Sequence, residues 1–167
     1  MLKPLIILGS GGYGKTVLDI AEQVGYNSII VLDDADSAHP LSSFKTYLDL
    51  PNVEFIPAFG NNEFRLSWCD CLTNTGATLA TLIHPTAYVS PKAVIEPGTV
   101  ILPHAVVNTN VMIKRGCIIN LSAIIDHGCV IEEGCHICLG AIVKGENRVP
   151  RLTKIEAREV VERAAMQ

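Results

Sequence analysis

The sequence predicts two parts: a small Rossmann-like parallel α/β domain over residues 1–80, followed by a parallel β-helix over residues 81–167. Three observations support this prediction. Strand-like and helix-like segments alternate through the first part, a glycine-rich turn follows the first strand, and the chain from Leu82 onward repeats every six residues. Alternating strands and helices are typical of parallel sheets, and a short fixed repeat is typical of a solenoid.

The α/β part begins with a continuously apolar strand at Leu5–Leu8. A helix over Tyr13–Val24 follows, with apolar side chains at helical spacing. A second apolar strand is expected at Ser28–Leu32, a third at Val53–Ala58, and a second helix at Glu63–Cys71. Together these segments amount to half of a doubly wound fold.

The second part divides into thirteen hexads from Leu82 onward: LIHPTA, YVSPKA, VIEPGT, VILPHA, VVNTNV, MIKRGC, IINLSA, IIDHGC, VIEEGC, HICLGA, IVKGEN, RVPRLT and KIEARE. The second position is always Ile or Val, and the sixth is Ala, Thr, Val or Cys in the first ten hexads. Each hexad is expected to form one short strand and a corner, with the aliphatic side chain on the axis and the small residue in the corner. Three hexads close one triangular coil.

The first position of each hexad points outward when the second points inward. It is apolar in ten of the first eleven hexads, and His136 is the exception. An outward apolar row of this size needs a covering surface. We therefore expect an oligomer, most economically a homotrimer whose β-helices pack side by side.

Charge and composition exclude several classes of function. A net charge of −4 makes nucleic acid and anionic membrane surfaces unexpected partners. The apolar run Leu5–Leu8 is too short for a signal peptide or a membrane span, so we expect a cytoplasmic protein. The six cysteines do not form two zinc-binding pairs with matching spacing, and Cys117, Cys129 and Cys135 occupy the sixth position of a hexad, so no metal is expected.

The turn GSGGYGKT at residues 9–16 satisfies both the dinucleotide pattern G-x-G-x-x-G and the P-loop pattern G-x-x-x-x-G-K-[ST]. A P-loop enzyme needs a second acidic strand and a larger sheet than the roughly 65 residues before the first hexad can supply. Asp33 and Asp34 end the second strand, where an acid can hold a ribose hydroxyl. A single half-domain predicts a single nucleotide, with its phosphates at the helix start.

Several segments resemble the bacterial acetyl-CoA-dependent sugar acetyltransferases with hexapeptide repeats: the glycine turn, the Asp33–Asp34 pair, FGNN at Phe59–Asn62, IHPTA at Ile83–Ala87, and INLSAIIDHGC at Ile119–Cys129. That family includes N-acetyltransferases of UDP-4-amino-4,6-dideoxy sugars and O-acetyltransferases of sialic acid. The resemblance implies a left-handed β-helix, a homotrimer with active sites between subunits, and acetyl-CoA as co-substrate.

The resemblance also implies roles for single residues. His127 matches the catalytic base, and Asn120 matches a position that lines the same site. An acid commonly follows this histidine in the family, whereas here Gly128 follows it and Asp126 precedes it as the candidate orienting group. Because neighbours in a strand point in opposite directions, Asp126 is not expected to reach the ring readily.

His136 and Gly145 match family positions that contact the acetyl group or the coenzyme thioester. Nine residues, or half a coil, separate His127 from His136, so the two histidines are expected on opposite sides of one β-helix and to meet only across a subunit interface. The nucleotide sugar is expected to contact Gly9, Ser10, Gly11, Gly12, Asp33, Asp34, Gly60 and Asn61. His84 and His104 are expected on the surface.

We therefore expect an acetyl-CoA-dependent N-acetyltransferase of a UDP-linked 4-amino-4,6-dideoxy sugar, acting in surface glycan biosynthesis. One alternative is O-acetylation of sialic acid or a related sugar. An alternative from another class is a catalytically weak or inactive nucleotide-sugar-binding trimer, which the Gly128 position motivates.

Overall fold

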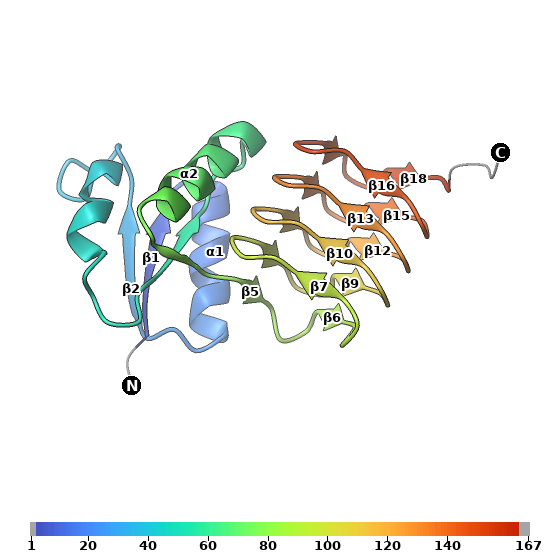
Figure 1. The fold of residues 1–167 in the computed structure, drawn as a ribbon, viewed down its shortest axis with the longest axis horizontal. Coiled ribbons are helices and arrows are strands. Elements are labelled where there is room, and N and C mark those ends of the chain that lie inside the picture. Colours follow the sequence, from blue (N-terminus) through green and yellow to red (C-terminus); the bar gives the residue numbers. More distant parts are fainter. Residues whose placement is uncertain (1–2, 164–167) are drawn as a thin grey trace.

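The computed structural model describes residues 3–163, so the outermost residues of the two predicted domains, 1–2 and 164–167, lie outside it. A small α/β domain lies beside a stack of short parallel strands (Figure 1). None of the helices in the described residues has the length and apolar character that crossing a membrane requires.

The α/β domain is built on a four-stranded parallel sheet in the order β2-β1-β3-β4. Its elements are β1 (Pro4–Leu8), α1 (Gly12–Gln23), β2 (Ser28–Leu32), the 3-10 helix η1 (Leu41–Tyr47), β3 (Glu54–Pro57), α2 (Asn62–Asn74) and β4 (Thr78–Leu79). The predicted strands and helices are confirmed, with small shifts at their ends. The sequence did not predict η1 and β4, because β4 has two residues and η1 has no regular apolar spacing.

Alternation along β1 supplies two apolar cores. Leu5 and Ile7 pack with Val17 and Ile20 of α1 on one face of the sheet, whereas Ile6 and Leu8 belong to the core on the η1 side. Residues of the β-helix join the first of these cores, namely Leu82, Val100, Leu102 and Ile118. The α1 helix therefore lies between the sheet and the β-helix, as Figure 1 shows.

The second part is a left-handed parallel β-helix of two-residue strands. They are β5 (Leu82–Ile83), β6 (Tyr88–Val89), β7 (Val94–Ile95), β8 (Val100–Ile101), β9 (Val106–Val107), β10 (Met112–Ile113), β11 (Ile118–Ile119), β12 (Ile124–Ile125), β13 (Val130–Ile131), β14 (His136–Ile137), β15 (Ile142–Val143), β16 (Arg148–Val149), β17 (Lys154–Ile155) and β18 (Val160–Val161). They form three parallel sheets, which we name by their first strands: the β5 sheet (β5-β8-β11-β14-β17), the β6 sheet (β6-β9-β12-β15-β18) and the β7 sheet (β7-β10-β13-β16).

The hexad positions behave as predicted in the inner coils of the β-helix, whereas Ile83 at the second position of the first hexad is 36% exposed. Second-position side chains such as Ile119 and Ile137 are completely buried on the axis, and sixth-position residues such as Ala123 and Cys129 are buried in the corners. The cysteines of residues 3–163 are all free thiols. The small-residue interpretation of the corner cysteines is therefore confirmed.

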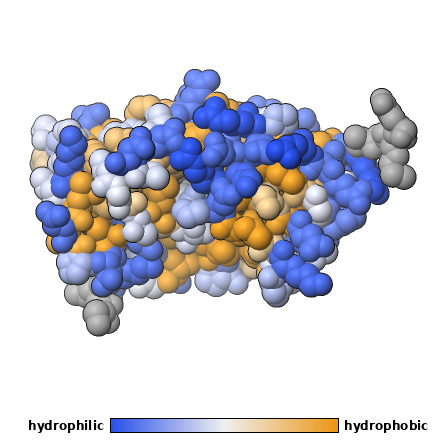
Figure 2. All heavy atoms as spheres, viewed as in Figure 1, coloured by the Kyte–Doolittle hydropathy of each residue, from blue (hydrophilic) through white to orange (hydrophobic). Residues whose placement is uncertain are grey.

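The outward row is not one uniform exposed surface. On the β5 sheet, Leu82, Val100 and Ile118 are at most 1% exposed, because the α/β domain covers them. On the β6 and β7 sheets, Tyr88 is 57% exposed and Val94 is 52% exposed. Hydrophobic side chains accordingly gather among hydrophilic ones over the β-helix in Figure 2. The prediction that the whole row needs a partner subunit is wrong for one face, and two faces remain uncovered.

His84 lies at the junction of the two parts. Its side chain is buried, with Nε2 2.8 Å from Gln23 Oε1 of α1 and Nδ1 2.9 Å from Thr86 Oγ1. The prediction of a surface histidine is therefore wrong, because helix α1 covers this corner of the first coil. His104 is exposed, as expected.

Candidate active site

The glycine loop joins the carboxyl end of β1 to the start of α1. Gly9 has a φ of +112°, and a Cβ atom on Gly14 would lie only 2.1 Å from the carbonyl oxygen of Gly9. These two glycines are therefore needed for the close approach of α1 to β1. A Cβ atom on Gly11 or Gly12 would meet nothing within 4 Å, so this part of the loop faces open space at the amino end of the helix.

A cavity of about 450 Å³ lies against this loop. It is lined by six of the eight predicted nucleotide-sugar residues, namely Gly9, Gly11, Gly12, Asp33, Gly60 and Asn61. Asp33 accepts hydrogen bonds from the backbone N–H of Ala35 and from the N–H and hydroxyl of Ser10, at 2.9, 2.6 and 2.9 Å. These bonds hold the pKa of Asp33 below its usual value. Asp34 instead accepts from Leu41 N at 2.9 Å and does not line the cavity.

A second cavity of about 260 Å³ continues from the first toward the β-helix. Both cavities are lined by Gly12, Tyr13 and Gly60, and the second also reaches Asn120 and His136. Its remaining lining is largely apolar, with Leu102, Leu121 and Leu139. No lysine or arginine lines either cavity within the described part of the chain.

His136 is held in this second cavity by Asn120. The Asn120 Nδ2 atom is 2.9 Å from His136 Nε2, and Asn120 Oδ1 accepts from Leu121 N at 2.8 Å. Since the amide nitrogen donates, Nε2 accepts and the ring proton is on Nδ1, which is buried without a hydrogen-bond partner among residues 3–163. Burial is the main cause that lowers the pKa of His136 to about 4, and the charges of Arg65 and Lys154 contribute to this shift.

His127 occupies the corner between β12 and β13, on another side of the β-helix. Its Nδ1 atom is 3.0 Å from Asp126 Oδ1, and that oxygen also accepts from the backbone N–H of His127 at 2.7 Å and from Asn108 Nδ2 at 2.9 Å. These hydrogen bonds lower the pKa of Asp126 to about 2. An ionised carboxylate only accepts, so a neutral His127 ring carries its proton on Nδ1 and leaves the Nε2 lone pair free, in a side chain that is 47% exposed.

The expectation that Asp126 would not readily reach the ring is wrong. Strand β12 ends at Ile125, so Asp126 and His127 belong to the corner, where strand alternation no longer applies. Gly128 has a φ of +67°, a conformation that L side chains rarely adopt. Glu146 holds the same conformation one coil later, at φ +64°, and the acid that contacts the His127 ring is Asp126.

Gly145 lies directly against His127, because eighteen residues are one full coil. A Cβ atom on Gly145 would be 2.5 Å from His127 Cε1. Within residues 3–163, no backbone acceptor pairs with the Gly145 N–H. The structure thus regroups the predicted site: Gly145 contacts His127 rather than His136, and Asn120 contacts His136 rather than His127, since β11 and β14 are neighbours in one sheet.

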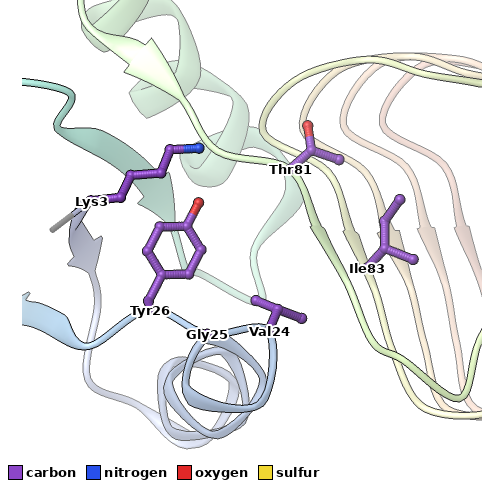
Figure 3. Close-up of a pocket in the computed structure, with 6 residues that line it drawn as sticks. All are labelled: Lys3, Val24, Gly25, Tyr26, Thr81 and Ile83. Atoms are coloured by element: carbon purple, nitrogen blue, oxygen red, sulfur yellow. The ribbon is translucent and has the colours of Figure 1, made fainter. Parts of the chain in front are cut away.

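A separate cavity of about 330 Å³ lies at the opposite edge of the α/β sheet, near the amino end of β1. Figure 3 shows Lys3 and Tyr26 on its sheet side, with Thr81 and Ile83 on the segment that enters the β-helix. Lys3 and Tyr26 both bind Glu54 and are not part of the glycine loop. In the described residues, no group of three or more His, Cys, Asp or Glu side chains could hold a metal ion.

The sequence interpretation missed three residues that line these cavities or contact residues of the predicted site: Tyr13, Asn108 and Arg65. Tyr13 lines both cavities. Asn108 could have been found from its place one coil before Asp126. Arg65 shares the buried face of α2 with Cys69 and Leu72, at the spacing of a core residue.

Comparison with known proteins agrees with this architecture. Residues 4–72 match the family described as the PglD N-terminal domain. The acetyltransferase domain of PglB from Neisseria gonorrhoeae FA1090, solved in complex with acetyl coenzyme A, is 32% identical with a TM-score of 0.88, over 96% of this chain and 82% of that one. PerB from Caulobacter crescentus, in complex with CoA and GDP-perosamine, shares the fold at 22% identity and a TM-score of 0.79, over 98% and 90% of the two chains. This chain belongs to the hexapeptide-repeat sugar acetyltransferases, a family of acyltransferases.

Proposed function

We propose that the chain transfers the acetyl group of acetyl-CoA to the amine of a nucleotide-linked sugar. The observation that carries this proposal is the state of His127, whose Nδ1 proton is held by Asp126 while the Nε2 lone pair stays open. A neutral imidazole in this tautomer can accept a proton from an attacking amine. The acetyl coenzyme A bound by the gonococcal relative supports the choice of donor.

The reaction needs only two groups from the chain besides its binding surfaces. The amine nitrogen forms a bond with the thioester carbonyl carbon, and the carbon–sulfur bond then breaks. His127 Nε2 takes the proton from the nitrogen and returns it to the leaving thiolate. The N–H of Gly145, which has no backbone partner in the described part of the chain, would donate to the developing oxyanion.

We place the nucleotide in the cavity of the glycine loop and the sugar in the adjoining cavity. Phosphates fit the open helix start at Gly11 and Gly12. The leucines of the second cavity favour a deoxy sugar, and among the described residues no lysine or arginine lines it to match the carboxylate of sialic acid. We therefore propose a UDP-linked 4-amino-4,6-dideoxy sugar as acceptor and regard O-acetylation of sialic acid as the less favoured alternative.

The site is completed, in this proposal, by a second subunit of a homotrimer. The exposed outward rows of the β6 and β7 sheets flank the corner that carries His127. Covering these rows would bring another subunit to the His127 and Gly145 corner, whereas Asn120 and His136 lie beside the α/β domain. Free thiols fit a reducing cytoplasm.

The test is to incubate the protein with acetyl-CoA and UDP-4-amino-4,6-dideoxyglucose and to follow the acetylated sugar by mass spectrometry. Product detection is preferable to a thiol reagent, because Cys71 is exposed. An alkali-stable product indicates an amide, and an alkali-labile one an ester. Product formed only from free sialic acid would replace this proposal with the O-acetyltransferase. Thermal stabilisation by UDP with no product from any sugar would support the binding-protein alternative.

A further inference from the structure

Arg65 is a buried cation that pairs with no acidic side chain among residues 3–163. Its side chain is 1% exposed, in the first turn of α2. Its guanidinium donates to Gly116 O at 2.8 Å, Phe59 O at 2.9 Å, Asn62 Oδ1 at 2.9 Å, Gly134 O at 2.9 Å and Cys135 O at 3.3 Å. All of these acceptors are neutral oxygens. A buried charge is costly unless its donors are satisfied, so this arrangement is demanding in geometry.

The acceptors belong to two separate parts of the site. Phe59 and Asn62 are the ends of the FGNN stretch, whose Gly60 and Asn61 line the cavity of the glycine loop. Gly134 and Cys135 lie at the corner directly before His136. A single guanidinium therefore joins the nucleotide cavity to the coil that carries this histidine.

Asn62 extends the same link to the next coil. Its Nδ2 atom donates to Leu152 O at 3.0 Å and lies 3.4 Å from Thr153 O. Thr153 O in turn accepts from the backbone N–H of His136 at 2.9 Å. The peptide group between Cys135 and His136 is thus linked to the first turn of α2 on both sides. Its carbonyl oxygen accepts from Arg65, and its N–H donates to Thr153 O, which lies beside Asn62.

We propose that Arg65 is a positioning residue, which holds the Phe59–Asn62 stretch at a set distance from His136 so that one nucleotide sugar can occupy both cavities. The identity of the substrate in this inference, a nucleotide sugar, rests on the proposed function. The charges of Arg65 and Lys154 also help to keep His136 neutral, whereas Glu156 acts in the opposite direction.

The chain offers a matched control in Asp70, which also joins α2 to the β-helix. Its carboxylate is 2.5 Å from Arg115 Nη2, and Arg115 binds Glu133 of the neighbouring coil. None of these three residues lines the two substrate cavities. Asp70→Asn therefore removes a contact between the two parts without touching the site.

The experiment compares Arg65→Met, Arg65→Lys and Asp70→Asn with the wild type. Each variant is measured for melting temperature, for kcat and KM of the nucleotide sugar, and for the NMR titration of His136. We expect at least a tenfold loss of kcat/KM in both Arg65 variants, since lysine keeps the charge but cannot reach all of the acceptors. The pKa of His136 should rise toward its usual value in Arg65→Met and stay low in Arg65→Lys. Asp70→Asn should keep kcat/KM within about twofold of the wild type, as expected for a surface ion pair.

The proposal is overturned if folded Arg65→Lys retains wild-type kcat/KM, or if Asp70→Asn loses as much as the Arg65 variants do. Arg65→Lys keeps the test decisive should Arg65→Met fail to fold. If the wild type itself transfers no acetyl group, the proposed function fails separately. In that case UDP titration of the Gly60 and Asn61 amides still tests Arg65, because unchanged UDP affinity in Arg65→Lys contradicts the positioning role.

Discussion

The imidazole of His127 packs against Gly145 on the next coil, where a Cβ atom would come within 2.5 Å of the ring carbon Cε1. Gly145→Ala should therefore displace the ring without straining the backbone. Because small displacements of a catalytic group are costly, we expect kcat to fall about tenfold or more. In a His127→Ala background the same change should have no further effect. An equal loss in both backgrounds would contradict the contact as the cause.

Asp126→Asn should impair catalysis while leaving the β-helix folded. The carboxylate holds the Nδ1 proton of His127 and is itself fixed by Asn108. We expect at least a tenfold loss in kcat for Asp126→Asn, a smaller loss for Asn108→Leu, and at least a hundredfold loss for His127→Ala. Circular dichroism checks the fold. A fully active Asp126→Asn enzyme would exclude Asp126 as the orienting group.

His136 predicts a specific dependence of stability on pH. Its pKa is lowered to about 4 in the folded protein, so between that value and about 6.5 the unfolded chain binds a proton that the folded chain does not. Stability should therefore fall as pH decreases through this range, by about 1 to 2 kcal/mol between pH 7 and pH 5. Urea unfolding of the wild type and of His136→Asn at several pH values measures this change in the free energy of unfolding. If the free energy of unfolding depends on pH equally in the two proteins, His136 is not the source of the dependence.

Two glycines of the loop should differ sharply in their tolerance of alanine. Gly14→Ala places a Cβ atom 2.1 Å from Gly9 O and should cost about 3 kcal/mol in the free energy of unfolding. The added Cβ atom of Gly11→Ala meets no atom of residues 3–163 within 4 Å, so this variant should keep a melting temperature near that of the wild type. If the open side of the loop receives phosphate, Gly11→Ala should still weaken thermal stabilisation by UDP. If UDP stabilises Gly11→Ala as much as the wild type, the glycine loop is not part of the nucleotide site.

The uncovered rows of the β-helix predict self-association. Ile124 is 38% exposed on the β6 sheet, in the row of Tyr88. Sedimentation at micromolar concentration should give three times the chain mass of 18.0 kDa, and Ile124→Lys should lower that mass and the acetyl transfer together. A wild-type particle with the mass of one chain would refute the trimer.

Local regularities are the part of this protein that could be predicted from its sequence. The six-residue period specifies the β-helix, because the Ile and Val residues at the second position of its inner coils are buried on the axis whatever lies outside. The glycine turn and the strands beside it specify the small parallel sheet in the same way. Family resemblance then pointed to His127, His136, Asn120 and Gly145 individually, and the fold it implied is confirmed.

Non-local contacts decided how these residues are grouped. The stacking of coils brings Gly145 onto His127 and Asn120 onto His136, and the end of β12 at Ile125 frees Asp126 to bind the ring. The seating of α1 on the β5 sheet buries one outward row, and the packing of α2 against the corners at Gly116 and Gly134 encloses Arg65. Such relationships depend on side-chain packing between segments far apart in the chain, whereas periodicity within the sequence reports only which face of each segment is buried.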